Sequence, residues 1–147
     1  MSTAILQATT TQPTATYDVA TQTITLTVIV SPGADPSQPD VVPAPISVPK
    51  GDWILFWNLQ AEGGTATFDS VALPENPLSS GNVTVSDSAL VDPLQWTAKI
   101  HNQVTGFNGF DYSIVVNWSQ DSPSGPPSPL QRVVKDPTIA VTTDPLG

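Results

Sequence analysis

The strongest constraint on the fold of this chain is a two-residue alternation of apolar and polar side chains. It is clearest in residues 21–30, where four aliphatic side chains alternate with threonines; they are Ile24, Leu26, Val28 and Val30. Successive side chains of a β-strand point to opposite faces, so this segment is predicted to be a strand with one buried face and one face in water. A shorter run at residues 14–19 is placed to pair with it as a hairpin.

Further strand-like segments follow along the chain. They cover residues 46–48, 53–59, 65–73, 83–85, 95–101, 110–118 and 130–142, the last interrupted by Asp136-Pro137. In residues 53–59 both faces are apolar. We therefore expect that strand to be central and covered on both sides, or to present one face to a loop or a partner.

Proline and glycine mark the ends of these segments. The Pro-rich residues 31–45 and 122–129 lack many backbone donors, so both are predicted as loops, the first alternatively as an extended segment along a sheet edge. Pro49-Lys50-Gly51-Asp52 is predicted as a turn. Phe107-Asn108-Gly109-Phe110 is the strongest short hairpin signal, because Asn and Gly tolerate a positive φ.

The composition supports an all-β fold. Glu, a strong helix former, occurs only at Glu62 and Glu75, whereas Thr and Val are plentiful. With no helical periodicity and no internal repeat, we predict that residues 1–147 form a single antiparallel β-sandwich of about eight or nine strands.

Two stretches resemble the cupredoxin-like family. Residues 46–58 read ISVPKGDWILFWN, similar to that family's "kGd" turn feeding an apolar strand that ends in Trp-x-Asn. Residues 109–114, GFDYSI, are similar to the aromatic-x-aromatic strand that leads toward the copper-binding Cys, and residues 136–141 resemble the ending of small bacterial cupredoxin-like proteins of unassigned function. The resemblance implies a cupredoxin-like sandwich, and an immunoglobulin-like one remains the alternative.

The copper ligands of that family are missing from this chain. A blue-copper site needs a thiolate, two imidazoles and usually an axial Met. The chain has no Cys, one His and one Met, which is Met1, and Ile114 stands roughly where the Cys would fall. We expect no metal site, no cofactor and no electron-transfer role.

The charge distribution excludes several partners. Against 13 acidic residues the chain has four cations and a net charge of −9; the cations are Lys50, Lys99, Arg132 and Lys135. Four cations cannot form the electropositive stripe that phosphate neutralisation requires, and they give little attraction to anionic lipid. We therefore expect neither a nucleic acid nor a membrane as partner.

Targeting signals are weak in this sequence. Residues 1–20 lack a basic region, and their apolar run at 4–6 is too short for a secretory signal. No stretch approaches the roughly 20 apolar residues of a membrane helix. We expect a soluble protein and leave its compartment unknown.

Residues able to carry catalysis are few. His101 is the only imidazole, and strand alternation puts it on the solvent side, so we interpret it as a surface residue. Asp69 and Asp111 are the carboxylate pair that a hydrolase would use, which is the third hypothesis for function. Asp35 with Asp40, and Asp87 with Asp92, flank predicted loops without forming a calcium-binding sequence.

Aromatic residues suggest binding rather than catalysis. Strand alternation places Trp96 and Trp118 among aliphatic residues of the core. The candidate binding residues are therefore Trp53, Trp57 and Phe56. We predict a non-catalytic structural or interaction β-sandwich that binds a protein partner or self-assembles, with a carbohydrate-binding module as the alternative.

Overall fold

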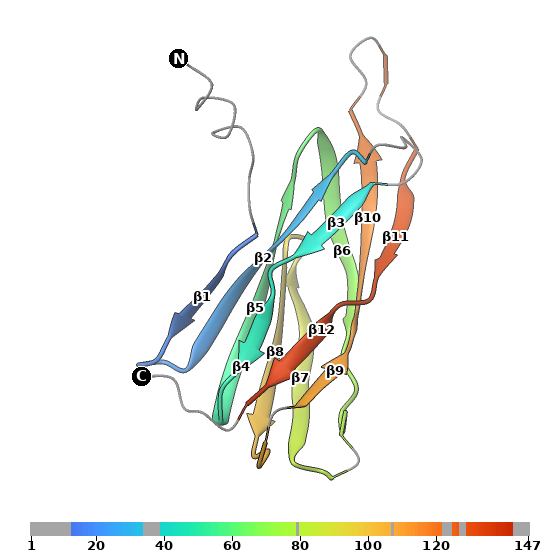
Figure 1. Ribbon diagram of the computed structural model, residues 1–147. Helices are drawn as coiled ribbons and strands as arrows, with labels where there is room; N and C mark the ends of the chain where they lie inside the picture. The colour runs from blue at the N-terminus through green and yellow to red at the C-terminus, as the bar shows by residue number, and fades with distance from the viewer. Residues whose placement is uncertain are drawn as a thin grey trace, which may run out of the picture.

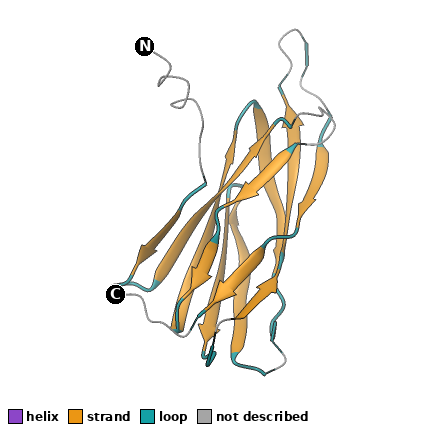
Figure 2. Cartoon of the chain, in the orientation of Figure 1, coloured by secondary structure: helices purple, strands orange, loops and turns teal. Residues whose placement is uncertain are grey.

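The computed structural model describes residues 13–33, 39–78, 80–106, 108–121, 125–126 and 129–142. These residues form strands, turns and loops without a helix (Figures 1 and 2). The strands are β1 (Ala15–Asp18), β2 (Thr23–Ser31), β3 (Asp40–Pro43), β4 (Ile46–Val48), β5 (Gly51–Ala61), β6 (Gly64–Ala72), β7 (Val83–Asp92), β8 (Gln95–Asn102), β9 (Asn108–Asp111), β10 (Ser113–Gln120), β11 (Gln131–Lys135) and β12 (Thr138–Val141). Within the described ranges no helix could span a membrane.

The first layer is a sheet in the order β1-β2-β5-β8-β7. One edge of β2 is shared by two short strands, because β1 pairs with residues 23–26 and β3 pairs with residues 28–31. The other edge of β2 pairs with β5 in parallel, and β5 pairs with β8 antiparallel. β5 is therefore central, as predicted for a strand with two apolar faces.

The second layer is made of two three-stranded sheets, β11-β10-β6 and β4-β12-β9. They join because β9 runs into β10 through Tyr112, and β11 runs into β12 through Asp136-Pro137. Pro137 has no N–H for the ladder, but its carbonyl accepts a hydrogen bond from the Tyr112 N–H at 3.0 Å. The junction of the two short sheets is thus itself hydrogen-bonded.

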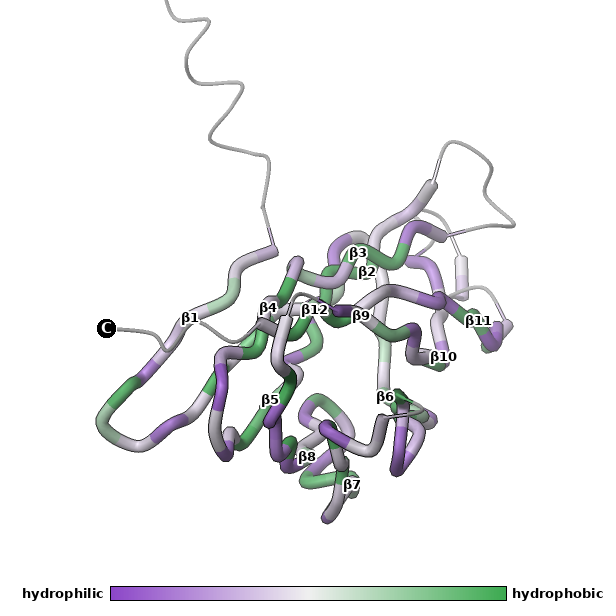
Figure 3. Tube along the Cα trace, turned by 60° about the horizontal axis from the view of Figure 1, so that its bottom comes forward, coloured by the Kyte–Doolittle hydropathy of each residue, from purple (hydrophilic) through white to green (hydrophobic). Residues whose placement is uncertain are grey.

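The core lies between the layers and follows the predicted alternation. The four aliphatic residues of β2 that were expected to point inward are at most 1% exposed. The apolar series that continues from β9 into β10 is also buried, and comprises Phe110, Tyr112, Ile114, Val116 and Trp118. Hydrophobic and hydrophilic residues alternate along the strands (Figure 3).

The predicted fold class, an all-β sandwich with mostly antiparallel pairing, is confirmed. The described chain has twelve strands instead of eight or nine, because β3 forms within the Pro-rich segment, Tyr112 separates β9 from β10, and Asp136-Pro137 separates β11 from β12. Two pairings, β2 with β5 and β4 with β12, are parallel. Residues 40–43 adopt the extended edge alternative, whereas 34–38, 122–124 and 127–128 lie outside the described residues.

Two local predictions are wrong. Asn108-Gly109 is not a hairpin turn but part of β9, where it pairs with Val141 and Ala140. The chain leaves β8 at Asn102 and crosses to the other layer, so β9 pairs with β12 and not with the preceding strand. The strand predicted at residues 83–85 continues as β7 to Asp92, because a bulge at Asp87, with φ of 52°, absorbs the irregularity.

Candidate functional site

The three aromatic residues predicted for binding lie on opposite faces of β5. Trp53 and Trp57 belong to the core, with 3% and 0% of their surface exposed. The Trp57 Nε1 donates to the Tyr112 hydroxyl at 3.1 Å, and Trp53 packs its ring edge-on to Tyr17. Phe56 is half-buried on the outer face, so it is the member of the three with appreciable exposed surface.

The outer face of the first sheet is a polar surface with a partly apolar centre. Phe56 lies between Thr25 of β2 and Thr97 of β8, and the half-buried Ile54 lies one row away. The Thr97 Oγ1 donates to the Leu55 carbonyl at 3.0 Å, which fixes that side chain. The face offers one aromatic ring edged by hydroxyl groups.

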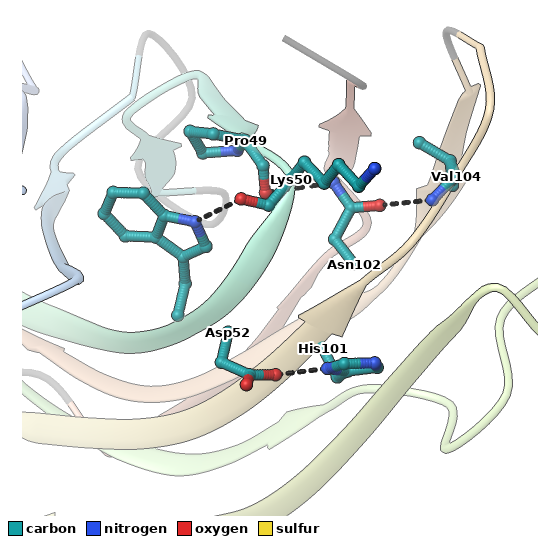
Figure 4. Close-up of polar contacts among 7 residues, drawn as sticks. Pro49, Lys50, Asp52, His101, Asn102 and Val104 are labelled. Atoms are coloured by element: carbon teal, nitrogen blue, oxygen red, sulfur yellow. Dashed lines mark hydrogen bonds and ion pairs between the residues drawn. The ribbon is translucent and has the colours of Figure 1, made fainter. Parts of the chain in front are cut away.

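A shallow groove of about 430 Å³ lies at one end of this face and contains the only histidine. His101 Nδ1 is hydrogen-bonded to the Asp52 carboxylate, and both side chains are exposed (Figure 4). Lys99 forms an exposed ion pair with Asp87 at 3.1 Å. No cluster of three potential metal ligands occurs in the described part of the chain.

The carboxylates predicted as a hydrolytic pair are engaged separately. Asp69 pairs with Arg132 at 3.6 Å, and Asp111 accepts a hydrogen bond from the Thr138 hydroxyl at 2.7 Å. Asp111 instead shares a shallow hollow with Asp136, whose carboxylate accepts a hydrogen bond from Ser113 at 2.5 Å. The structure thus groups Asp111 with Asp136 and not with Asp69.

Asp87 and Asp92, one of the two acidic pairs considered for calcium, do not flank a loop. Asp87 and Asp92 both belong to β7, and the Asp92 carboxylate accepts a hydrogen bond from the Leu94 N–H at 2.8 Å. Asp40 is the first residue of β3, and Asp35 lies outside the described residues. Asp92 therefore has a turn-forming role.

Among the described residues, no strand pairs with the edge of β11 that faces away from β10, because of the path that the chain takes before β4. β4 pairs in parallel with β12, with Ile46 opposite Ile139. Upstream of β4, however, the chain crosses to the other layer, where β3 pairs with β2 and the Ala44 N–H donates to the Thr27 carbonyl at 2.9 Å. Within the described chain, β11 consequently has β10 on one side and no strand on the other.

A groove of about 370 Å³ occupies the space between β3 and β11. Val42 of β3 and Val134 of β11 line it and are 44% and 52% exposed, and Leu130 just before β11 is 70% exposed. Arg132 and Lys135 line the same groove. This edge, defined by β3, Leu130 and β11, combines backbone polar groups, apolar side chains, two cations and the carboxylate of Asp40, and we call it the β11 edge.

The opposite side of the sandwich ends in β7, which has a different character. Its first residues are covered, since the Val85 N–H donates to the Glu75 carbonyl at 2.9 Å. Every residue from 86 to 92 is exposed, and Leu90 and Val91 are 49% and 50% exposed. This segment also contacts β6, because the Pro93 carbonyl accepts a hydrogen bond from the Phe68 N–H at 2.8 Å. Residues 86–94, which include the exposed Leu94 of the following turn, form what we call the β7 edge.

Asn102, which was not among the predicted site residues, is fully buried. Its amide nitrogen donates to the carbonyls of Val48 at 2.9 Å, Pro49 at 3.0 Å and Thr142 at 3.0 Å. Its amide oxygen accepts from the Val104 N–H at 3.1 Å (Figure 4). The signal was available, because the alternation of β8 places position 102 inward and an amide there requires partners.

Comparison with known proteins assigns the chain to no family. No family model matches the chain, and no curated protein matches its sequence. Among solved structures, the chain is similar to a crystal structure of a cysteine protease inhibitor from Entamoeba histolytica, at 13% identity and a TM-score of 0.28, over 80% of this chain and 94% of that one. A likeness at this level defines neither the fold nor the function.

Proposed function

We propose that this chain is a non-catalytic structural subunit that self-associates through the β11 edge. The observation that carries the proposal is an edge strand with no neighbour in the described chain, bordered by a groove with exposed Val42 and Val134. An edge strand offers unpaired N–H and C=O groups to an added strand, and pockets beside it accept alternate side chains.

Several features support a role without chemistry. His101, Asp69 and Asp111 are each engaged by a neighbouring side chain at the surface. We also infer that the sandwich is cupredoxin-like. In support, residues 46–58 form β4, the turn and β5, and Ile114 is 0% exposed at the position where the family's Cys would stand.

Light scattering over a range of protein concentrations tests self-association. The wild-type chain should gain mass with concentration, and Val134→Lys should remain monomeric, because a lysine beside an open edge opposes strand addition. Val19→Lys is the matched control, since Val19 is 48% exposed but lies in neither edge. A monomeric wild-type chain, or equal association of both variants, would contradict the proposal.

A second candidate function, carbohydrate binding, is favoured by one observation. Phe56 presents a half-buried ring on a flat face between Thr25 and Thr97, an arrangement suited to stacking on a pyranose ring. Titration calorimetry with a panel of soluble polysaccharides should detect binding that Phe56→Ala removes. Absence of heat with every member of the panel would exclude this candidate.

A further inference from the structure

We propose that copies of this chain assemble head to tail, with the β11 edge of one copy adding to the β7 edge of the next. The proposal rests on self-association through the β11 edge and names its partner surface. The partner is a second copy of this chain, recognised by apolar side chains and by opposite charge.

The first observation is where the exposed apolar residues lie. In the part of the chain that the structure describes, seven large hydrophobic residues are exposed, and they are Val19, Val42, Leu90, Val91, Leu94, Leu130 and Val134. Three belong to the β11 edge and three to the β7 edge, which leaves only Val19 elsewhere. Such clustering is unusual for a surface that is otherwise rich in threonine and serine, and it marks both edges as contact surfaces.

The second observation is that the two edges lie on opposite sides of the sandwich. β7 ends the first sheet at the side away from β3, and the Ser88 hydroxyl donates to the Val71 carbonyl of β6 at 3.5 Å. Figure 3 shows β7 at the bottom of the view and β3 with β11 toward the opposite side. One copy can therefore use both edges at once.

The third observation is charge complementarity. β11 carries Arg132 and Lys135, whereas the β7 edge contains Asp87 and Asp92. Arg132 and Asp87 already pair with Asp69 and Lys99 of the same chain, so the contact between copies draws on Lys135 and Asp92. Pairing β11 with another β11 would bring cations together, and pairing β7 with another β7 would bring carboxylates together. The β11–β7 combination places Lys135 opposite Asp92, whereas the two symmetric pairings place like charges of these strands together, and this favours the β11–β7 contact.

The side-chain order of the two strands also matches. In a parallel register, Val133-Val134-Lys135 faces Leu90-Val91-Asp92, which gives two apolar pairs and one pair of opposite charge. The pairing of β7 with β8 shifts register between Leu90 and Asp92, so Val91 has no partner on β8. Cross-strand pairs of both kinds stabilise sheets. This contact uses a different surface on each of the two copies, so every added copy still has one unoccupied edge. Assembly therefore continues as an open chain of copies unless the copies close into a ring.

Complementation of two edge variants tests the arrangement by light scattering. Val134→Lys blocks the β11 edge and Val91→Lys blocks the β7 edge, so each variant alone should be monomeric. An equimolar mixture should form a dimer and nothing larger, since one intact edge of each kind remains. If Val91→Lys assembles like the wild-type chain while Val134→Lys does not, self-association stands and the β7 partner is wrong.

Disulfide trapping in this cysteine-free chain tests the contact directly. Val134→Cys mixed with Val91→Cys should give a covalent dimer under mild oxidation, because a disulfide needs Cα atoms within about 7 Å. Val134→Cys mixed with Val19→Cys is the control and should not cross-link above the background of each variant alone. Rapid cross-linking of Val134→Cys with itself would overturn the head-to-tail arrangement in favour of a symmetric β11 contact.

Discussion

Tyr112 lies where the second layer passes from β9 to β10, and burial governs its ionisation. Burial raises the pKa of Tyr112 to about 12, an effect that the hydrogen bond from Trp57 partly offsets. In the unfolded chain the hydroxyl has its ordinary pKa of about 10. The unfolded state therefore ionises first as the pH rises.

This difference predicts an alkaline loss of stability. The contribution of Tyr112 is fully present below pH 10 and should be lost as the pH rises toward 12, by about 2–3 kcal/mol in total. Urea unfolding at intervals between pH 9 and pH 12 measures it. Tyr112→Phe should show a smaller decrease over the same interval, and equal decreases in both proteins would contradict the assignment.

Gly64 begins β6 at a point of close contact with β10. A Cβ there would lie 2.4 Å from the Ser119 carbonyl oxygen and 2.6 Å from the Trp118 ring. Gly64→Ala should therefore lower the free energy of unfolding by about 1–3 kcal/mol, the usual cost of overpacking. Gly106→Ala is the control, because a Cβ at Gly106 meets nothing within 4 Å, and chemical denaturation should find it nearly neutral. Equal effects would contradict the steric explanation.

At the scale of elements, Asn102 ties together segments that are distant in sequence. It connects the end of β8 with the turn after β4 and with the residue that follows β12. β8 belongs to the first layer and β4 and β12 to the second, so this one amide side chain links the two layers at this end of the sandwich.

Removing this side chain should be costly. Asn102→Ala removes the acceptor of the buried Val104 N–H and the donor to the Pro49 carbonyl, whereas the Val48 carbonyl still accepts from the Thr142 N–H at 3.1 Å, and we expect a loss of about 2–3 kcal/mol. Asn58→Ala is a suitable comparison, because Asn58 makes a partly buried hydrogen bond with Gln95 at 2.7 Å and should cost less than about 1 kcal/mol. Thermal or urea unfolding of both variants measures these losses. A smaller loss of free energy of unfolding for Asn102→Ala than for Asn58→Ala would contradict the role of Asn102.

Strand alternation predicted the elements well where a strand has one wet face. β2 and β8 follow the expected pattern because each buries every second residue against the same core. It failed where pairing depends on distant segments, since Asn108-Gly109 reads locally as a turn but is held in a ladder by β12. The parallel pairings have no local signature either, because they arise from crossings between layers.

The candidate site was less predictable than the strands. Trp53 and Phe56 were grouped as binding residues from their chemistry, although their odd and even positions place them on opposite faces of β5. The β11 edge lacks a neighbouring strand because the chain passes from one layer to the other at Ala44-Pro45. That passage depends on the pairing of β3 with β2, which are distant from β11 in the sequence. Proline spacing indicated an edge segment in that region but not which strand it would leave uncovered.

At the scale of the whole molecule, a net charge of −9 acts on stability through repulsion among carboxylates. The described ion pairs are Lys99–Asp87 and Arg132–Asp69, and all four side chains are at least 44% exposed. Exposed ion pairs contribute little to the free energy of unfolding. Added salt should therefore weaken the repulsion among carboxylates more than it weakens these attractions.

Raising NaCl from about 20 mM to about 500 mM should therefore raise the melting temperature, because the Debye length falls from tens of ångströms to a few. A gain of roughly 2–4 °C is expected for each kcal/mol of repulsion removed. The Val134→Lys variant is the appropriate protein, since its expected monomeric state separates folding from assembly. A calorimetric melting temperature that falls with NaCl would show that the exposed ion pairs outweigh the repulsion.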